Sequence, residues 1–293
     1  MADHDSPPVD KVTGTATTGH EWDGIRELNT PLPRWWLWIF YATIVWSIGY
    51  WVVYPSWPLI SSYTSGAFGW SSRDDVGAEL EALRQKRSAM MAKISSSSLE
   101  EIYGNPELLT FSRAIGRFAF GDNCAPCHGS GGAGAKGYAN LLDDDWLWGG
   151  KLNDIEMTIR HGVRSTDSAG RQGSMPAFGR DGILPPADIE AAADHVLRLA
   201  NLPVASTANR ERGAKVFAET CAACHGEDGK GKRDLGAPNL TDQVWLYGNS
   251  RAAIIEGLVN GRGGVMPPWL GRLDEPTIKA LAVYVYSLGG GEK

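Results

Sequence analysis

Two short motifs carry the residues whose types and spacing suggest chemistry. All four cysteines of the chain belong to C-x-x-C pairs, and a histidine directly follows each pair. The motifs are Cys124, Cys127 and His128, and Cys221, Cys224 and His225. Two thiols at this spacing can form thioether bonds to one haem, and the adjacent histidine can bind its iron. The sequence therefore predicts two covalently bound haem c groups, with the two histidines as proximal iron ligands.

The same cysteines could in principle form a zinc site or a redox-active disulfide. Structural zinc motifs separate their cysteine pairs by about 15–20 residues. Here the segment 128–220, which is 93 residues long, lies between the pairs. A thioredoxin-like pair needs no histidine directly after its second cysteine. Haem attachment is the hypothesis that accounts for all six residues.

A second axial ligand for each iron is expected among the methionines, because His/Met ligation is common in electron-carrying haem proteins. Met266 is the only methionine after the second motif, whereas Met157 and Met175 compete after the first. Met175 shares with Met266 a following proline and an aromatic residue three positions on, and Met157 lies in a helical pattern. We therefore expect Met175 and Met266 to complete the two iron sites.

The motifs lie inside two copies of a longer pattern. GRFAFGDNCAPCHG begins at Gly116 and GAKVFAETCAACHG begins at Gly213. Phe120 and Phe217 each lie four residues after the glycine, so glycine and phenylalanine share one face of a predicted helix. A glycine on that face lets another backbone come close. The pattern predicts a helix crossing in each copy.

Further matches extend the repeat to the end of the chain. ANLLDDDWLWGG at 139–150 matches PNLTDQVWLYGN at 238–249, and each copy ends in an apolar segment with helical periodicity, at 188–200 and 277–289. We expect that final helix to close its own copy around its own haem. The sequence predicts an N-terminal segment at 1–34, a membrane helix at 35–54, and a surface segment with a connecting helix at 55–104. The first haem domain is predicted at 105–202, a linker at 203–206, and the second haem domain at 207–293.

Two further histidines are rival iron ligands. His161 and His195 follow the first motif, but neither has a histidine counterpart in the second copy, where Glu256 and Tyr284 stand near the matching positions. Ordinary packing or polar roles are therefore favoured for both histidines. Whether either could replace Met175 stays open from the sequence.

The segment from Trp35 to Tyr54 is uncharged and aromatic-rich. Twenty residues at 1.5 Å each span about 30 Å, the thickness of a hydrocarbon layer, so the segment predicts one membrane helix. The preceding tail is polar and acidic, which is unlike a cleaved signal peptide. Arg26 and Arg34 precede the span, and the next positive charge is Arg73, so the N-terminus is expected on the cytoplasmic side.

Charge excludes one class of partner. The formal net charge is −6, and no cluster of lysine and arginine interrupts the acidic balance. Binding to phosphate backbones needs a basic face. We therefore expect no nucleic acid as a partner. Membrane lipid is an expected partner because of the predicted membrane helix.

The repeats resemble the cytochrome c fold, and HEWDGIRELNTPLPRWW at 20–36, the single span and the twin motifs together resemble subunit III of cbb3-type cytochrome c oxidases. The resemblance implies an all-α chain with one N-terminal transmembrane helix and two tandem cytochrome c-like haem domains. Some members of that family carry a second membrane segment, which this sequence lacks.

The resemblance also implies a role. The subunit would take electrons from a periplasmic cytochrome c donor and pass them to a mono-haem cytochrome c subunit, and thence to the haem-copper catalytic subunit that reduces oxygen to water. It would sit in the bacterial inner membrane with its haem domains in the periplasm, and catalysis would belong to the partner. Two alternatives stay open: the cytochrome subunit of a membrane dehydrogenase, and a haem-based gas-binding module.

Overall fold

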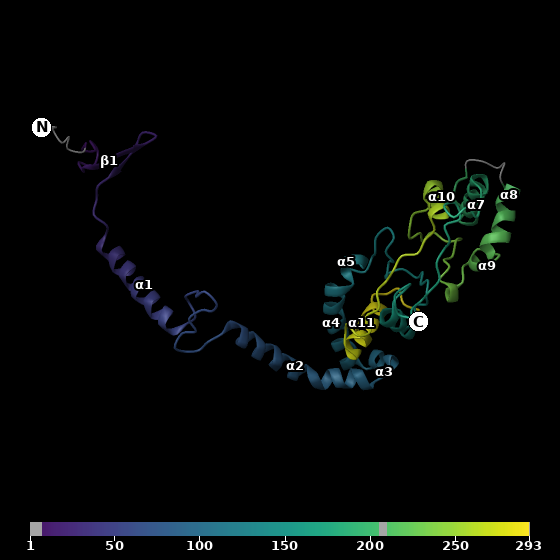
Figure 1. Ribbon diagram of the computed structural model, residues 1–293, viewed down its shortest axis with the longest axis horizontal. Coiled ribbons are helices and arrows are strands. Elements are labelled where there is room, and N and C mark those ends of the chain that lie inside the picture. Colours follow the sequence, from purple (N-terminus) through teal and green to yellow (C-terminus); the bar gives the residue numbers. More distant parts are fainter. Residues whose placement is uncertain (1–7, 205–209, 293) are drawn as a thin grey trace. The chain divides into compact units, whose positions relative to one another are not determined.

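The computed structural model describes residues 8–204 and 210–292, which fall into two compact units, 1–84 and 85–293. Apart from one short hairpin near the N-terminus, the described elements are helices (Figure 1). This confirms the predicted all-α class.

The first unit begins with an antiparallel hairpin of β1 (Thr17–Trp22) and β2 (Ile25–Leu28). Asp23 and Gly24 form its turn with φ of 49° and 84°. Asp-Gly is a favoured pair for two-residue hairpin turns, because both positions need positive φ. The tail expected to be polar and acidic thus contains an ordered hairpin, for which Asp23-Gly24 is the sequence signal.

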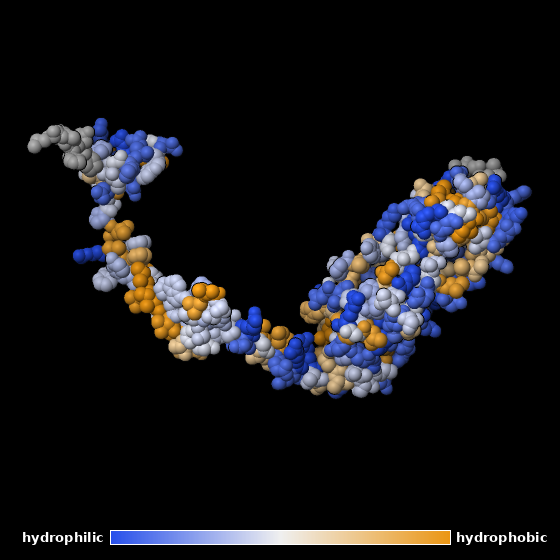
Figure 2. Space-filling view, viewed as in Figure 1, coloured by the Kyte–Doolittle hydropathy of each residue, from blue (hydrophilic) through white to orange (hydrophobic). Residues whose placement is uncertain are grey.

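Helix α1 (Arg34–Val53) is the membrane segment expected at 35–54. Among the residues that the structure describes, it is the one helix long and apolar enough to cross a bilayer, and none of it is buried inside the chain. Figure 2 shows its hydrophobic surface. The following loop returns to the end of α1, where the Ala67 and Phe68 amides donate to the carbonyls of Val52 and Val53 at 2.9 and 3.1 Å. Two carbonyls left open at the helix end are thereby satisfied.

Helix α2 (Ser72–Ser96) contains the connecting helix that the sequence predicts, and the boundary between the two units falls within it. In the second unit, α3 (Leu99–Gly104) starts with a capping box, because the Ser98 hydroxyl accepts from the Glu101 amide and the Glu101 carboxylate accepts from the Ser98 amide. Asn105 caps the next helix, α4 (Pro106–Asn123), in a similar way. These caps set where the haem-motif region begins.

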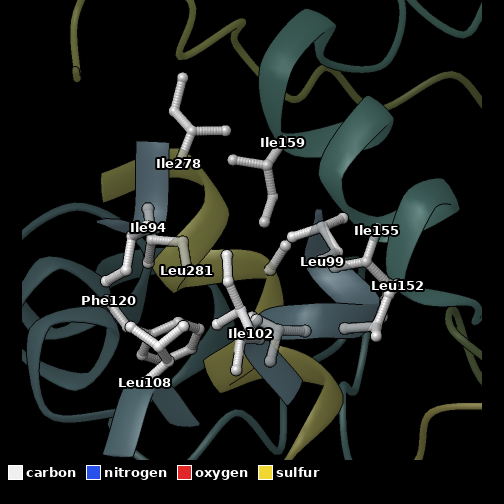
Figure 3. Close-up of a cluster of buried hydrophobic side chains, with 13 residues drawn as sticks. Ile94, Leu99, Ile102, Leu108, Phe120, Leu152, Ile155, Ile159, Ile278 and Leu281 are labelled. Carbon is white, nitrogen blue, oxygen red and sulfur yellow. The ribbon is translucent and has the colours of Figure 1, made fainter. Parts of the chain in front are cut away.

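One group of helices forms the first lobe, which consists of α3, α4, α5 (Ala125–His128), α6 (Leu152–His161) and α11 (Glu275–Tyr286). Their apolar faces meet in one core, shown in Figure 3. The core's larger members are Ile94, Leu99, Ile102, Phe120, Ile155, Ile159, Ile278 and Leu281. Burial of such side chains typically contributes about 1.5–3 kcal/mol each, so this core is the main support of the lobe.

The remaining helices form the second lobe: α7 (Pro186–Leu199), α8 (Arg210–Val216), η1 (Phe217–Cys221), α9 (Ala222–His225) and α10 (Arg251–Asn260). A short 3-10 helix, η2 (Arg233–Leu235), follows the second motif. Two small clusters around Phe178 and Phe217 form the core, and Ile254 packs against both.

Each lobe combines helices from both copies of the repeat. Helix α4 of the first copy packs on α11 of the second, and α7 of the first copy packs on α8 of the second. Figure 1 shows α11 beside α4, and α10 beside α7. We expected each copy to close on its own final helix, and the helix contacts differ from that expectation. The copies are alike in sequence, so their apolar faces do not distinguish one closing helix from the other.

The crossings are made by the segments that follow α6 and α10. Val163 pairs with Met266, and Met175 pairs with Arg262, in antiparallel bridges. These crossing segments, 162–175 and 261–266, carry the chain from the first lobe to the second and back again. The ranges 105–202 and 207–293 describe the repeats, and as haem-domain boundaries they stay a prediction.

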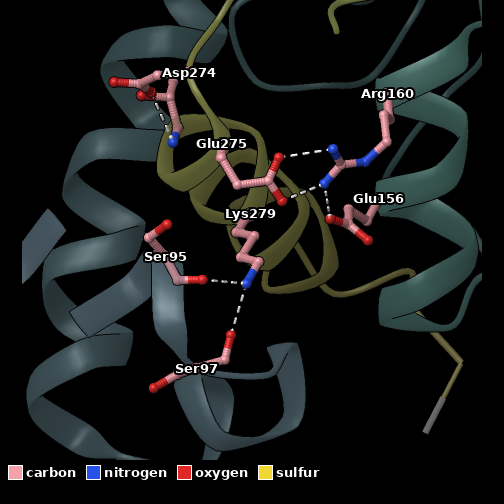
Figure 4. A network of polar contacts seen from close by, with 8 residues as sticks. Ser95, Ser97, Glu156, Arg160, Asp274, Glu275 and Lys279 are labelled. Carbon is pink, nitrogen blue, oxygen red and sulfur yellow. Dashed lines mark hydrogen bonds and ion pairs between the residues drawn. The ribbon is translucent and has the colours of Figure 1, made fainter. Parts of the chain in front are cut away.

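Polar contacts also join the two copies within the first lobe (Figure 4). The Arg160 guanidinium on α6 donates to both carboxylate oxygens of Glu275 on α11, at 2.7 and 2.5 Å, and to Glu156 at 2.6 Å. Lys279 on α11 donates to the carbonyls of Ser95 and Ser97, both at 2.8 Å. A guanidinium that engages both oxygens of a carboxylate fixes orientation as well as distance. These contacts hold α11 against α6 of the first copy and against the end of α2.

Candidate functional site

Both predicted crossings occur, and both use the expected glycine. A Cβ atom added to Gly116 would lie 2.5 Å from the Cβ of Tyr284 and would collide with the Ala280 carbonyl oxygen. A Cβ atom on Gly213 would lie 3.1 Å from the Cβ of His195. Close approach of this kind requires glycine. The crossings place each haem motif directly after a helix that is locked against its lobe.

The motif cysteines and histidines lie on one short helical turn in each lobe. In the first motif the His128 amide donates to the Cys124 carbonyl at 2.9 Å. Gly129 and Gly226 end the two turns with the same φ of 78°. Both turns therefore have the same backbone form, and each presents two thiols and one imidazole from a single turn of helix.

The two histidine rings are held in the same way. Nδ1 of His128 lies 2.9 Å from the Ala139 carbonyl oxygen, and Nδ1 of His225 lies 3.0 Å from that of Pro238. A carbonyl oxygen can only accept, so Nδ1 carries the proton and donates it. Nε2 is then left unprotonated, which is the form that binds a metal. Burial lowers the pKa of His225 and so favours its neutral form.

The thiols do not have the properties of a redox-active pair. The four cysteines are not joined by disulfides. Burial raises the pKa of Cys124 and of Cys221 to about 11, whereas reactive C-x-x-C thiols have lowered pKa values. Among the residues that the structure describes, no group of three or more histidine, cysteine or acidic side chains could hold a metal ion such as zinc. The zinc and disulfide alternatives therefore gain no support, and the donor set fits a haem.

The two candidate methionines lie in different lobes. Met266 packs against the core of the first lobe, as does Cys124. Met175 packs against the Phe178 cluster of the second lobe. Ile254 contacts both that cluster and the neighbouring cluster that contains Cys221. The sequence expectation assigned Met175 to the first haem, but Met175 lies with the second motif and Met266 with the first. The crossing segments account for this exchange.

The backbones of both methionines are fixed by paired hydrogen bonds. Met175 and Arg262 exchange bonds of 2.9 and 3.1 Å, and Met266 and Val163 exchange two of 3.0 Å. A Cβ atom on Gly261 would lie 2.7 Å from the Met175 carbonyl oxygen, and Gly261 has a φ of 73°. Only glycine adopts that conformation without strain. Each methionine is therefore held by the element that the other copy supplies.

The rival ligands have other contacts. Nδ1 of His161 lies 2.8 Å from an Asp167 carboxylate oxygen. The His195 ring lies 5.0 Å from that of Phe217, just as the Tyr284 ring lies 5.4 Å from that of Phe120. His195 thus occupies the packing position that the repeat alignment assigned to it. Met157 lies on the exposed side of α6, with 38% of its surface accessible.

Three arginines around the crossing were missed by the sequence analysis: Arg164, Arg171 and Arg262. They follow no repeat match, and their proximity depends on the exchange of helices. No pattern within one copy could have indicated it.

Comparisons with known proteins identify the family. A family model described as the N-terminal domain of cytochrome oxidase-cbb3, FixP, matches residues 14–61. A second, described as cytochrome c oxidase, cbb3-type, subunit III, matches residues 113–196 and 208–285. Both halves of the second match contain one haem motif.

Curated relatives match the chain over nearly its whole length. It is 58% identical to the cbb3-type cytochrome c oxidase subunit FixP of Bradyrhizobium sp. (strain ORS 278), over 100% of both chains. It is 58% identical to FixP of Azorhizobium caulinodans, over 97% of each, and 48% identical to subunit CcoP of Cereibacter sphaeroides, over 98% of this chain and 99% of that one. The cytochrome c domains of these subunits imply covalently bound haem c. The chain belongs to the family of subunit III of cbb3-type cytochrome c oxidases.

Proposed function

We propose that the chain carries two haem c groups and is the electron-entry subunit of its oxidase. When bound, each haem supplies one-electron ferric/ferrous chemistry. The observation that carries the proposal is the matched pair of imidazoles, His128 and His225, each oriented by a backbone carbonyl with a methionine in the same lobe.

The proposed coordination is crossed between the copies. Cys124 and Cys127 attach the first haem, and Cys221 and Cys224 attach the second. His128 and Met266 bind the first iron, and His225 and Met175 bind the second. The chain folds so that Met266 shares a core with the first motif, and Met175 shares Ile254 with the second.

His/Met ligation has a functional consequence. Ligation by one imidazole and one thioether would leave neither iron an open position for oxygen or another substrate. The chain's own residues would hold and orient the haems. Oxygen reduction falls to the haem-copper subunit, and this chain supplies it with electrons.

The proposed path runs from a periplasmic cytochrome c donor to this chain, then to the mono-haem subunit and the haem-copper subunit. The relatives are named as subunits of cbb3-type oxidases, which supports partners of this kind. Arg26 and Arg34 before α1 favour a cytoplasmic N-terminus and periplasmic haem lobes in the inner membrane.

Isolation of the tagged full chain from membranes tests the proposal. We expect a haem-copper subunit and a mono-haem cytochrome to copurify, and a pyridine haemochrome assay of the separated polypeptide to give two c haems. A quinoprotein or flavoprotein partner would instead support a dehydrogenase. One haem per chain would overturn the di-haem assignment, and carbon monoxide binding to the reduced chain would support a gas-binding module.

A further inference from the structure

Arg164 lies where the two crossing segments meet. Its Nε donates to the Gly264 carbonyl at 2.6 Å, and its Nη1 donates to the Gly173 carbonyl. The first carbonyl belongs to one crossing segment and the second to the other. The side chain therefore contacts both paths by which the chain passes between the lobes.

Arg164 has no counter-charge in the part of the chain that the structure describes. Within residues 8–204 and 210–292, no carboxylate lies within ion-pair distance of its guanidinium, which is half-buried. Its partial burial also lowers the pKa of Arg164. Its φ is 49°, a left-handed conformation that residues with a side chain rarely adopt. A partly buried charge is stabilised by an anion beside it, and the described residues supply none at Arg164, so the position suits an anion from outside the chain.

Arg171 shows a similar deficit on the side of the first lobe. Its Nε is buried and has no hydrogen-bond partner among the described residues. Its Nη2 lies 3.4 Å from the Trp148 carbonyl oxygen and forms a long ion pair, at 3.5 Å, with an Asp154 carboxylate oxygen. An orphaned donor on a guanidinium indicates a missing acceptor.

Arg262 occupies a comparable place on the side of the second lobe. Its guanidinium lies 4.2 Å from the centre of the Tyr247 ring, and that of Arg171 lies 5.9 Å from the Trp148 ring. Trp148 and Tyr247 occupy matching positions in the two copies. The Nη2 of Arg262 donates to the Ala253 carbonyl at 3.4 Å and forms a long ion pair, at 3.6 Å, with Glu256. Each lobe thus has one arginine over an equivalent aromatic ring, with Arg164 between them.

We propose that Arg164, Arg171 and Arg262 bind the propionate carboxylates of the two haems, with Arg164 shared between them. The inference rests on the proposed function, because it requires two haems. A haem attached through its vinyl edge carries its propionates on the opposite edge, and Met175 and Met266 hold the crossing segments against the two haem sites. Guanidinium groups match carboxylates in shape and charge.

In this arrangement the reduction potentials of both haems depend on the positive charge of Arg164. Reduction adds one negative charge to a haem, so a nearby cation stabilises the reduced form and raises the potential. Loss of Arg164 is expected to lower both potentials. Loss of Arg171 is expected to lower mainly the potential of the first-lobe haem, and loss of Arg262 mainly that of the second.

Redox titration of the full-length chain in detergent, followed at the c-haem absorption, tests the inference. We expect R164Q to shift both reduction equilibria by about tenfold, which is about 59 mV for a one-electron couple. R171Q should shift one haem in this way. R180Q is the matched control, because Arg180 is exposed and forms an ion pair with its neighbour Asp181 at 3.2 Å, and it should leave both potentials unchanged.

Two readouts separate this inference from a folding defect and from the proposed function. Haem content and the methionine-iron charge-transfer band show whether each variant keeps its haems, and R164K should keep both the band and the two potentials. If R164Q loses its haem, R171Q and R262Q decide the outcome. Two haems with potentials unchanged in all three glutamine variants would overturn the inference while leaving the di-haem function intact.

The anion could also come from solution. If a free anion occupied the cluster, the wild-type potentials would shift with added phosphate and R164Q would abolish that dependence. Such a result would overturn the propionate assignment. We expect the difference between wild type and R164Q to persist at every phosphate concentration.

Discussion

Replacement of Gly116 by alanine tests the crossing of α4 and α11. Non-bonded carbon atoms rest about 3.5–4.0 Å apart, whereas the added Cβ would lie 2.5 Å from that of Tyr284. It would also meet the Ala280 carbonyl, which belongs to a helix backbone and cannot rotate away. The two helices must therefore separate by about 1 Å, as the difference between these distances requires.

The magnitude follows from two opposing effects. Overpacking typically costs about 1–3 kcal/mol, and a backbone collision belongs at the upper end of that range. Alanine in place of glycine regains about 1 kcal/mol of helix propensity. We expect Gly116→Ala to lower the free energy of unfolding by about 2 kcal/mol, from the difference between these effects.

Gly121 provides a matched control on the same helix. A Cβ atom there would meet nothing within 4 Å, so Gly121→Ala should stabilise the chain by about 0.4–1 kcal/mol. Guanidinium denaturation of the haem-loaded full chain, followed by far-UV circular dichroism, measures both variants. A G116A chain that is as stable as G121A would refute the crossing as described.

Three further outcomes are expected. Met175→His should lower the potential of the second-lobe haem by about 59 mV or more, because imidazole favours ferric iron more than a thioether does, and redox titration should show the first-lobe haem unchanged. Gly261→Ala should strain the support of Met175, so the methionine-iron band should disappear at a lower denaturant concentration than in wild type. The ion pair with Arg160 lowers the pKa of Glu275 in the folded chain. The pair therefore stabilises the fold at pH above the pKa of an unfolded glutamate, about 4.3, and this stabilisation is lost as the pH falls through the folded pKa. E275Q should therefore show a smaller loss of stability on acidification than wild type, in denaturation curves measured at successive pH values.

Local features could be predicted from the sequence. The span expected at 35–54 is α1 at Arg34–Val53, because length and lack of charge are properties of one segment. Gly116 and Gly213 were expected at helix crossings and lie there, because the requirement for glycine is a property of one position.

Pairings between distant segments could not be predicted. The partner of Gly116 is a helix of the other copy, and both closing helices present small and aromatic residues with the same spacing. The positions of Arg164, Arg171 and Arg262 depend on that pairing, so they were beyond reach as well. The Asp23-Gly24 turn was available in the sequence and was overlooked, because the acidic tail was interpreted by composition alone.

Crossed ligation is the central claim, and chains that retain one haem test it most directly. In C124S/C127S only the second motif can attach haem. We predict that adding Met175→Leu to this chain abolishes the methionine-iron charge-transfer band, whereas adding Met266→Leu leaves it in place. In C221S/C224S only the first motif can attach haem, so Met266→Leu should abolish the band and Met175→Leu should leave it in place. Loss of the band on Met266→Leu in the first chain, with its retention on Met175→Leu, would contradict the account.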